Sequence, residues 1–130
     1  MKSFIYVFPI VFSSFVYAQD TYLCIPSSAT GFSFTQKTSR WEESSFNIVE
    51  KKFLLKKKTG QWQWSNFGET NEYTCQERGQ TSINCNLFLG EVIFDKKTLR
   101  YLKTYLPGYV DGVESNANTP HIMIGKCSPL

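Results

Sequence analysis

The chain has 130 residues and a formal net charge of +3; 42% of its residues are hydrophobic and 16% are aromatic. This length suits one domain with a single core and is too short for two domains of ordinary size. The charge is too small to indicate a polyanionic partner such as nucleic acid, and each cluster of lysines has to be interpreted from its own surroundings.

Residues 1–18 are typical of a cleaved signal peptide. A short positive start precedes an almost wholly apolar run over residues 4–15, and small or tolerated side chains lead up to a cleavage point after Ala18. The run contains Pro9 and is shorter than the roughly 20 residues that span a bilayer. We therefore expect no transmembrane anchor after cleavage, and export of residues 19–130 to the periplasm or the extracellular space.

Short runs of β-branched and aromatic residues recur through residues 19–130, separated by Gly, Ser, Asn, Thr and Lys. The runs are YLCI, GFSF, FNIVEKKFLL, QWQWSNF, EYTC, INCNLFL, EVIF, LRYL and HIMIG. Runs of this length and composition predict strands. We expect a single all-β domain, an antiparallel meander that closes into a small barrel or a two-sheet sandwich.

One turn pattern supports this interpretation: an apolar residue, two mostly polar residues, Lys-Thr, a variable residue, Arg or Gln, and an aromatic residue. It occurs at residues 34–41, 55–62 and 94–101. A four-residue loop in each turn places the apolar and aromatic residues opposite each other, a contact worth roughly 0.2–1 kcal/mol. The third occurrence favours a strand over a short helix for residues 97–106.

The second of these turns contains two tryptophans and is preceded by lysines. A four-residue loop predicts that Leu55 faces Trp62. Two residues farther along each strand, Phe53 then faces Trp64, which puts both tryptophans on one buried face. An alternative function, a small carbohydrate-binding module, would instead use Trp62 and Trp64 as an exposed platform.

The tip of the same hairpin is the best candidate for a partner contact. It comprises Lys56, Lys57, Lys58, Thr59 and Gly60. A simpler interpretation is a solvated hairpin end that protects a sheet edge from aggregation. Nucleic-acid binding is not expected, because the predicted register turns the neighbouring aromatic rings inward.

The four cysteines predict two disulfides, because an exported protein meets an oxidising compartment. Three connectivities are possible. A hairpin centred near Gln80 places Cys75 opposite Cys85, which leaves Cys24 to pair with Cys127. We expect both bonds to be structural, and we expect no zinc site, because no two cysteines have the close spacing of zinc ligands.

Catalytic signatures are not apparent in the sequence. His121 is the sole histidine, the cysteines are expected to be paired, and there is no GxSxG turn. Residues 111–120 form a polar stretch without the spacing of a calcium loop, and we expect a flexible loop that could contact a partner. The prediction is a non-enzymatic protein with no catalytic residues, cofactor or metal.

The motifs YLC, GFSF, FDKKTLRY, PGYVDG and TPHIMIGKC, with the central cysteine pair, resemble a group of small exported proteins of bacteria and their phages. This resemblance implies an exported, disulfide-containing protein and does not imply a mechanism of action. The layout is more loosely similar to periplasmic inhibitors of C-type lysozymes, although their Ser-Gly-x-x-Tyr loop has no match here. We therefore predict a binding or envelope-associated module whose partner is an unknown protein or envelope component, with lysozyme inhibition through the hairpin tip as an alternative.

Overall fold

The computed structural model describes residue 10 and residues 20–130, so the predicted signal peptide lies almost wholly outside the described residues. Over the described part the chain forms strands and one short 3-10 helix. These elements are β1 (Thr21–Thr35), β2 (Arg40–Ser45), β3 (Phe53–Lys58), β4 (Gln61–Asn66), β5 (Glu72–Arg78), β6 (Ser82–Leu87), β7 (Gly90–Asp95), β8 (Arg100–Tyr105), η1 (Tyr109–Asp111) and β9 (His121–Pro129). Within this part, no helix is both long enough and apolar enough to cross a membrane.

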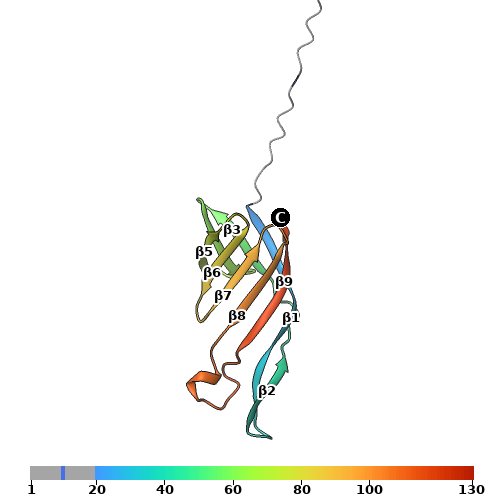
Figure 1. The fold of residues 1–130 in the computed structure, drawn as a ribbon, viewed down its shortest axis with the longest axis vertical. Coiled ribbons are helices and arrows are strands. Elements are labelled where there is room, and N and C mark those ends of the chain that lie inside the picture. The colour runs from blue at the N-terminus through green and yellow to red at the C-terminus, as the bar shows by residue number, and fades with distance from the viewer. Residues whose placement is uncertain (1–9, 11–19) are drawn as a thin grey trace, which may run out of the picture.

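The strands form one antiparallel sheet that closes on itself. Strands β3 to β9 follow one another as a meander, β1 pairs with β3, and β9 pairs back with β1 to complete an eight-stranded barrel. Strand β2 is an extra strand that pairs only with the second half of β1. In Figure 1 this β1–β2 hairpin projects at the end of the barrel opposite the C terminus. The all-β prediction is confirmed, as a barrel.

Side chains fill the interior of the barrel, as expected for eight strands. The buried core includes Trp62 and Trp64, which are 4% and 1% exposed, so their predicted burial is confirmed. The indole of Trp64 stacks on Phe53 with ring centroids 5.0 Å apart, and Tyr22 packs against Phe94 at 5.0 Å. Burying each large side chain stabilises the fold by roughly 1.5–3 kcal/mol.

Two of the three predicted hairpin registers are confirmed: Phe34 faces Trp41, and Phe94 faces Tyr101. The register predicted for the second hairpin is wrong by two residues, since Leu55 faces Trp64.

The error comes from the loop. Thr59 and Gly60 both have positive φ, 47° and 80°, and close a two-residue turn directly between Lys58 and Gln61. Such a turn matches the twist of a hairpin. A shift of two residues keeps every side chain on its face, so both tryptophans remain inside.

The lysine-rich hairpin tip is exposed to solvent as expected, but the interpretation that it protects a sheet edge is wrong. Strand β3 is paired on both sides, with β1 and with β4. The free edge is β2, whose sequence RWEESS is short and carries charged side chains, features that discourage further strand pairing.

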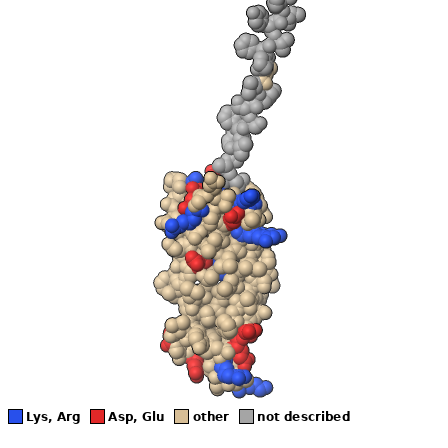
Figure 2. Space-filling view, viewed as in Figure 1, with Lys and Arg blue, Asp and Glu red and all other residues tan. Residues whose placement is uncertain are grey.

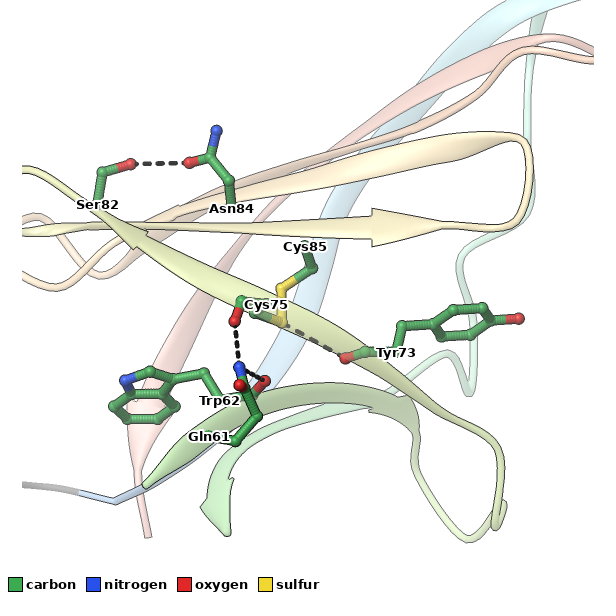
Figure 3. The surroundings of a disulfide bond; sticks show 7 residues. All are labelled: Gln61, Trp62, Tyr73, Cys75, Ser82, Asn84 and Cys85. Carbon is green, nitrogen blue, oxygen red and sulfur yellow. Dashed lines mark hydrogen bonds between the residues drawn. A yellow bond between two sulfur atoms is a disulfide. The ribbon is translucent and has the colours of Figure 1, made fainter. Parts of the chain in front are cut away.

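Both predicted disulfides are present. Cys24–Cys127 joins β1 to β9 where the barrel closes, and Cys75–Cys85 joins facing positions of β5 and β6. Figure 3 shows the second bond, beside which Gln61 of β4 donates a hydrogen bond to the carbonyl of Cys75. All four cysteines are buried, which fits a structural role.

Replacing Thr59 by Asn is expected to stabilise the protein by about 1 kcal/mol. A β-branched residue is strained at positive φ, whereas Asn-Gly is favoured in this turn. The measurement is the urea unfolding midpoint at constant slope. Thr38→Asn is the control, because Thr38 does not have positive φ. Equal stabilisation by both substitutions, or none by Thr59→Asn, contradicts the turn assignment.

Removing Cys24–Cys127 by paired serine substitutions is expected to cost more stability than removing Cys75–Cys85. The sequence separations are 103 and 10 residues, for which chain entropy predicts about 4.7 and 2.8 kcal/mol. Both pairs are buried, so the cost of burying serine is similar. Unfolding free energies of the two double variants test this order, and a larger loss from the shorter loop contradicts it.

Candidate binding surface

An apolar strip crosses the outer face of β7, β8 and β9. Ile93 faces Leu102, and Leu102 faces Ile124 on its other side. Ile122 lies two residues farther along β9 and belongs to the same outer face, since it alternates with the buried Met123. We name Ile93, Leu102, Ile122 and Ile124 the apolar strip.

On the same outer face, charged side chains border the apolar strip at its ends along the strands: Glu91, Asp95, Arg100 and Lys126. Figure 2 shows a broad uncharged zone between two charged ends of the molecule. Ile122 is 48% exposed and Ile124 is 51% exposed, so these side chains are in contact with solvent and not with the core. Exposed apolar side chains that adjoin one another are typical of interaction sites.

The apolar strip runs into a groove of about 390 Å³ beside the start of β9. The groove is lined by Thr30, Gly31, Phe32, Glu43, Tyr105, Leu106, Pro120, His121 and Ile122. Its largest apolar walls are Phe32 of β1, Ile122 of the strip and Leu106, which is 64% exposed after the end of β8.

Two further hollows adjoin this groove. One, of about 770 Å³, contains Leu106 and Val110 in its lining, and the other, of about 330 Å³, is lined by Phe32, Trp41 and Tyr109. We name the residues that line the groove and these two hollows the hook surface. Its acidic residues are Glu43, Glu91 and Asp111, and it includes neither Lys nor Arg.

Asn116 holds the loop between β8 and β9 against β1. Its Oδ1 accepts a hydrogen bond from the backbone N–H of Phe34 at 2.6 Å, and its Nδ2 donates to the Phe34 carbonyl at 2.8 Å. Nearby, the N–H of Phe32 donates to the Pro120 carbonyl at 3.0 Å. The amide of Asn116 therefore takes the place of a neighbouring strand where β1 continues past the first residue of β9.

The same loop is tied to β8 as well. The hydroxyl of Tyr105 donates to Oδ1 of Asn118 at 2.6 Å. At Gly31, a Cβ atom would lie 2.1 Å from the Pro120 carbonyl oxygen, so this close approach of the loop to β1 requires glycine. Residues 111–120, predicted as a polar loop, are thus anchored at several points.

Aromatic rings join the loop to the β1–β2 hairpin. Phe34 packs edge-on against Trp41, and Trp41 against Tyr109, each pair with centroids 5.9 Å apart. Phe34 is buried beneath these contacts, whereas Tyr109 remains exposed. The loop thereby presents Tyr109 and its neighbour Val110, which is 91% exposed, beside the groove.

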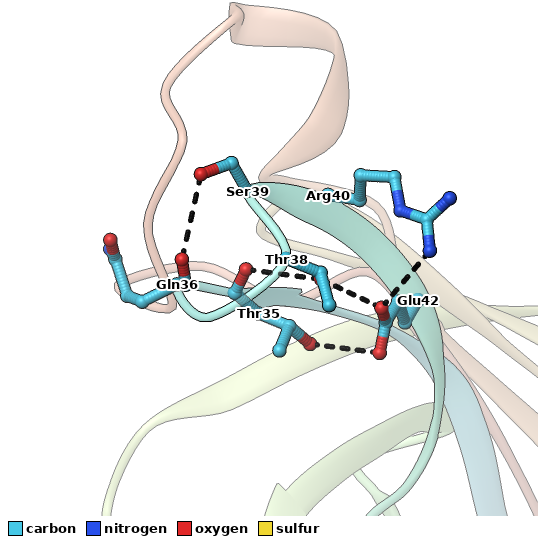
Figure 4. A network of polar contacts seen from close by, with 6 residues as sticks. All are labelled: Thr35, Gln36, Thr38, Ser39, Arg40 and Glu42. Atoms are coloured by element: carbon cyan, nitrogen blue, oxygen red, sulfur yellow. Dashed lines mark hydrogen bonds and ion pairs between the residues drawn. The ribbon is translucent and has the colours of Figure 1, made fainter.

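The turn of the β1–β2 hairpin is stabilised by Glu42. Figure 4 shows its carboxylate accepting hydrogen bonds from Thr38 at 2.7 Å and Thr35 at 3.2 Å, with Arg40 at 3.9 Å. The bond from Thr38, then that from Thr35, and more weakly the charge of Arg40, lower the pKa of Glu42. Because the pKa of Glu42 is lowered in the folded protein, its carboxylate stabilises the folded turn at pH values above the usual carboxyl pKa. This stabilisation is lost as the pH falls through the folded-state pKa.

The predicted contact residues Lys56–Gly60 lie at the other end of the barrel. Lys56 faces Thr21 at the start of β1, whereas the hook surface surrounds the end of β1. Lys58 forms a hydrogen-bonded ion pair with Glu72, which raises the pKa of Lys58, and Lys56 lies 3.7 Å from the same carboxylate. The hairpin tip therefore has less uncompensated positive charge than its sequence indicates, and lysozyme inhibition through it stays a prediction.

The other candidate residues lie in the core or at its margin. Trp62 is buried and its Nε1 donates to Glu77 at 2.9 Å, so it offers no exposed ring for a sugar. The ring of His121 packs against Phe46 at 5.0 Å and Tyr105 at 5.5 Å. Among the described residues, no three His, Cys, Asp or Glu side chains group as metal ligands.

Neither a protein-family model, nor a curated protein, nor a solved structure matches this chain. The resemblance to small exported proteins therefore stays a prediction.

Asn116→Ala is expected to release the loop while leaving the barrel folded. Loss of both hydrogen bonds leaves the Phe34 backbone without its partner, at a local cost of about 1–3 kcal/mol. Hydrogen exchange at the Phe34 amide should become faster, while exchange in β4 and β6 stays slow. The control is Asn71→Ala, at an exposed loop position. Unchanged exchange at Phe34 contradicts the anchoring role.

Proposed function

We propose that this protein is an exported, non-catalytic binding module whose hook surface holds a segment of another polypeptide. The segment carries apolar side chains and at least one Lys or Arg. The observation that supports this proposal is the apolar strip, which continues through Ile122 into the hook surface, whose charged residues are all acidic.

The chemistry of the hook surface supports this choice of occupant. Phe32, Leu106 and Ile122 offer apolar area that is costly to leave in water. Glu43 and Glu91 are exposed and would attract a basic partner and repel an acidic one. Four of these five residues belong to strands and the fifth, Leu106, adjoins the anchored loop, so they are in place before binding, which lowers the entropy cost of association.

Two further features support an exported, non-catalytic role. Disulfides persist in oxidising compartments, and both bonds here close the barrel or one of its hairpins. The sole histidine is used in packing and in a 2.8 Å contact between its Nδ1 and the Thr119 carbonyl. We propose that the protein acts by positioning or occupying its partner.

A displayed random-peptide library tests the proposal directly. Selected peptides are expected to combine apolar residues with Lys or Arg. Their affinity, measured by fluorescence anisotropy, should fall about tenfold or more in Ile122→Lys, a loss of about 1.4 kcal/mol or more. Ile25→Lys is the matched control, because Ile25 is also 48% exposed on an outer strand face but lies beside Lys126, outside the hook surface.

An equal loss of peptide affinity in Ile122→Lys and Ile25→Lys, or the selection of acidic peptides from the library, would overturn the proposal. Moderate salt should weaken binding of the basic peptides, since the carboxylates of Glu43 and Glu91 are exposed. Sedimentation of the purified protein at rising concentration tests a second copy as the occupant. Self-association that Ile122→Lys abolishes would replace the polypeptide partner by a homodimer.

A further inference from the structure

Lys103 is directed into the barrel. It is a residue of β8 whose cross-strand neighbours are Val92 of β7 and Met123 of β9, both buried. Facing positions on adjacent strands share one side of the sheet, so Lys103 lies on the inner face. Its Nζ is 5.7 Å from the centroid of the Phe53 ring.

A cavity of about 240 Å³ adjoins this lysine. It is lined by Trp64, Asn66, Tyr73, Leu87, Phe88, Lys103, Thr104 and Tyr105. The Nε1–H of Trp64 is buried and has no hydrogen-bond partner among the described residues. The lining thus combines one cation with mainly apolar side chains, and the Trp64 indole N–H is closed off from solvent.

No described carboxylate lies within ion-pair distance of Lys103. Burial lowers the pKa of Lys103, and the charge of Lys51 lowers it further. Lys103 is half-buried, and a partly desolvated cation without an acidic partner costs stability; departures of this kind are typical of functional positions. Bringing a negative charge into the cavity would remove that cost.

We propose that this cavity binds the carboxylate of a small apolar molecule. The Lys103 ammonium donates to the carboxylate oxygens, and the rings of Tyr73, Phe88 and Tyr105 contact the apolar body. The volume corresponds to about eight water-sized groups, which suits a short organic acid or the terminal residue of a peptide. Lys103 is the one lysine in the lining of this cavity, which matches one negative charge.

This inference goes beyond the binding of a polypeptide on the hook surface. The cavity shares only Tyr105 and Leu87 with that surface. Its carboxylate donor, Lys103, does not belong to the hook surface, so binding at one site can be lost while binding at the other is kept.

Titration of the folded protein with hexanoate, followed by the NMR signal of the Trp64 indole N–H, tests the proposal. We expect a saturable shift, and affinity about tenfold or more weaker for hexanamide, which lacks the charge. Lys103→Met removes the charge, keeps most of the length of the side chain and should show the same loss of affinity for hexanoate. Lys126→Met, at an exposed position of β9, is the control and should bind as the wild type does.

Two tripeptides ending in leucine, one with a free carboxylate and one amidated, distinguish the two possible ligands, a peptide C terminus and a small organic acid. Stronger binding of the free tripeptide than of hexanoate assigns the site to peptide C termini, and the reverse order assigns it to small organic acids. No saturable shift with any carboxylate overturns the proposal, as does equal binding of hexanoate and hexanamide. That last comparison uses the wild-type protein and decides even if Lys103→Met does not fold.

Discussion

The length of β1 is the constraint on which the rest of the structure depends. With fifteen residues, β1 is longer than each of the strands that pair with it, yet the buried backbone groups along a strand must all be paired. On one side, β3 pairs with the start of β1 and β2 with its end; on the other side, β9 pairs with β1 from Tyr22 to Gly31. On the other side of that end, the side chain of Asn116 completes the pairing, and this is why the β8–β9 loop lies where a groove can form.

Much of the fold could be predicted because its signals are local. Strand runs, the facing of Cys75 and Cys85, and the burial of Trp62 depend on alternation and on short loops. The register of β3 with β4 was missed because the Lys-Thr-Gly sequence at the turn is compatible with a loop of two residues or of four. Burial was still predicted correctly, since side-chain direction depends only on whether the shift is even.

The candidate site could not be predicted in the same way. The loop at residues 111–120 was recognised as a possible contact region, but Phe32, Leu106 and Ile122 resemble core residues in sequence. They become surface residues only because β9 pairs with β1, two strands far apart in the chain, and because β2 leaves the barrel. Lys103 is the opposite case: its inward direction follows from alternation, but a lysine within a strand usually faces water.

The placement of the Cys24–Cys127 bond also determines how the domain carries mechanical load. Both cysteines lie within a few residues of the ends of the barrel, and the strands that contain them are neighbours. Tension applied at residues 20 and 130 passes directly across this covalent link. The chain between the two cysteines, including most of the meander and the hook surface, is bypassed, so a protein tethered at both ends can be pulled without its strands being drawn apart.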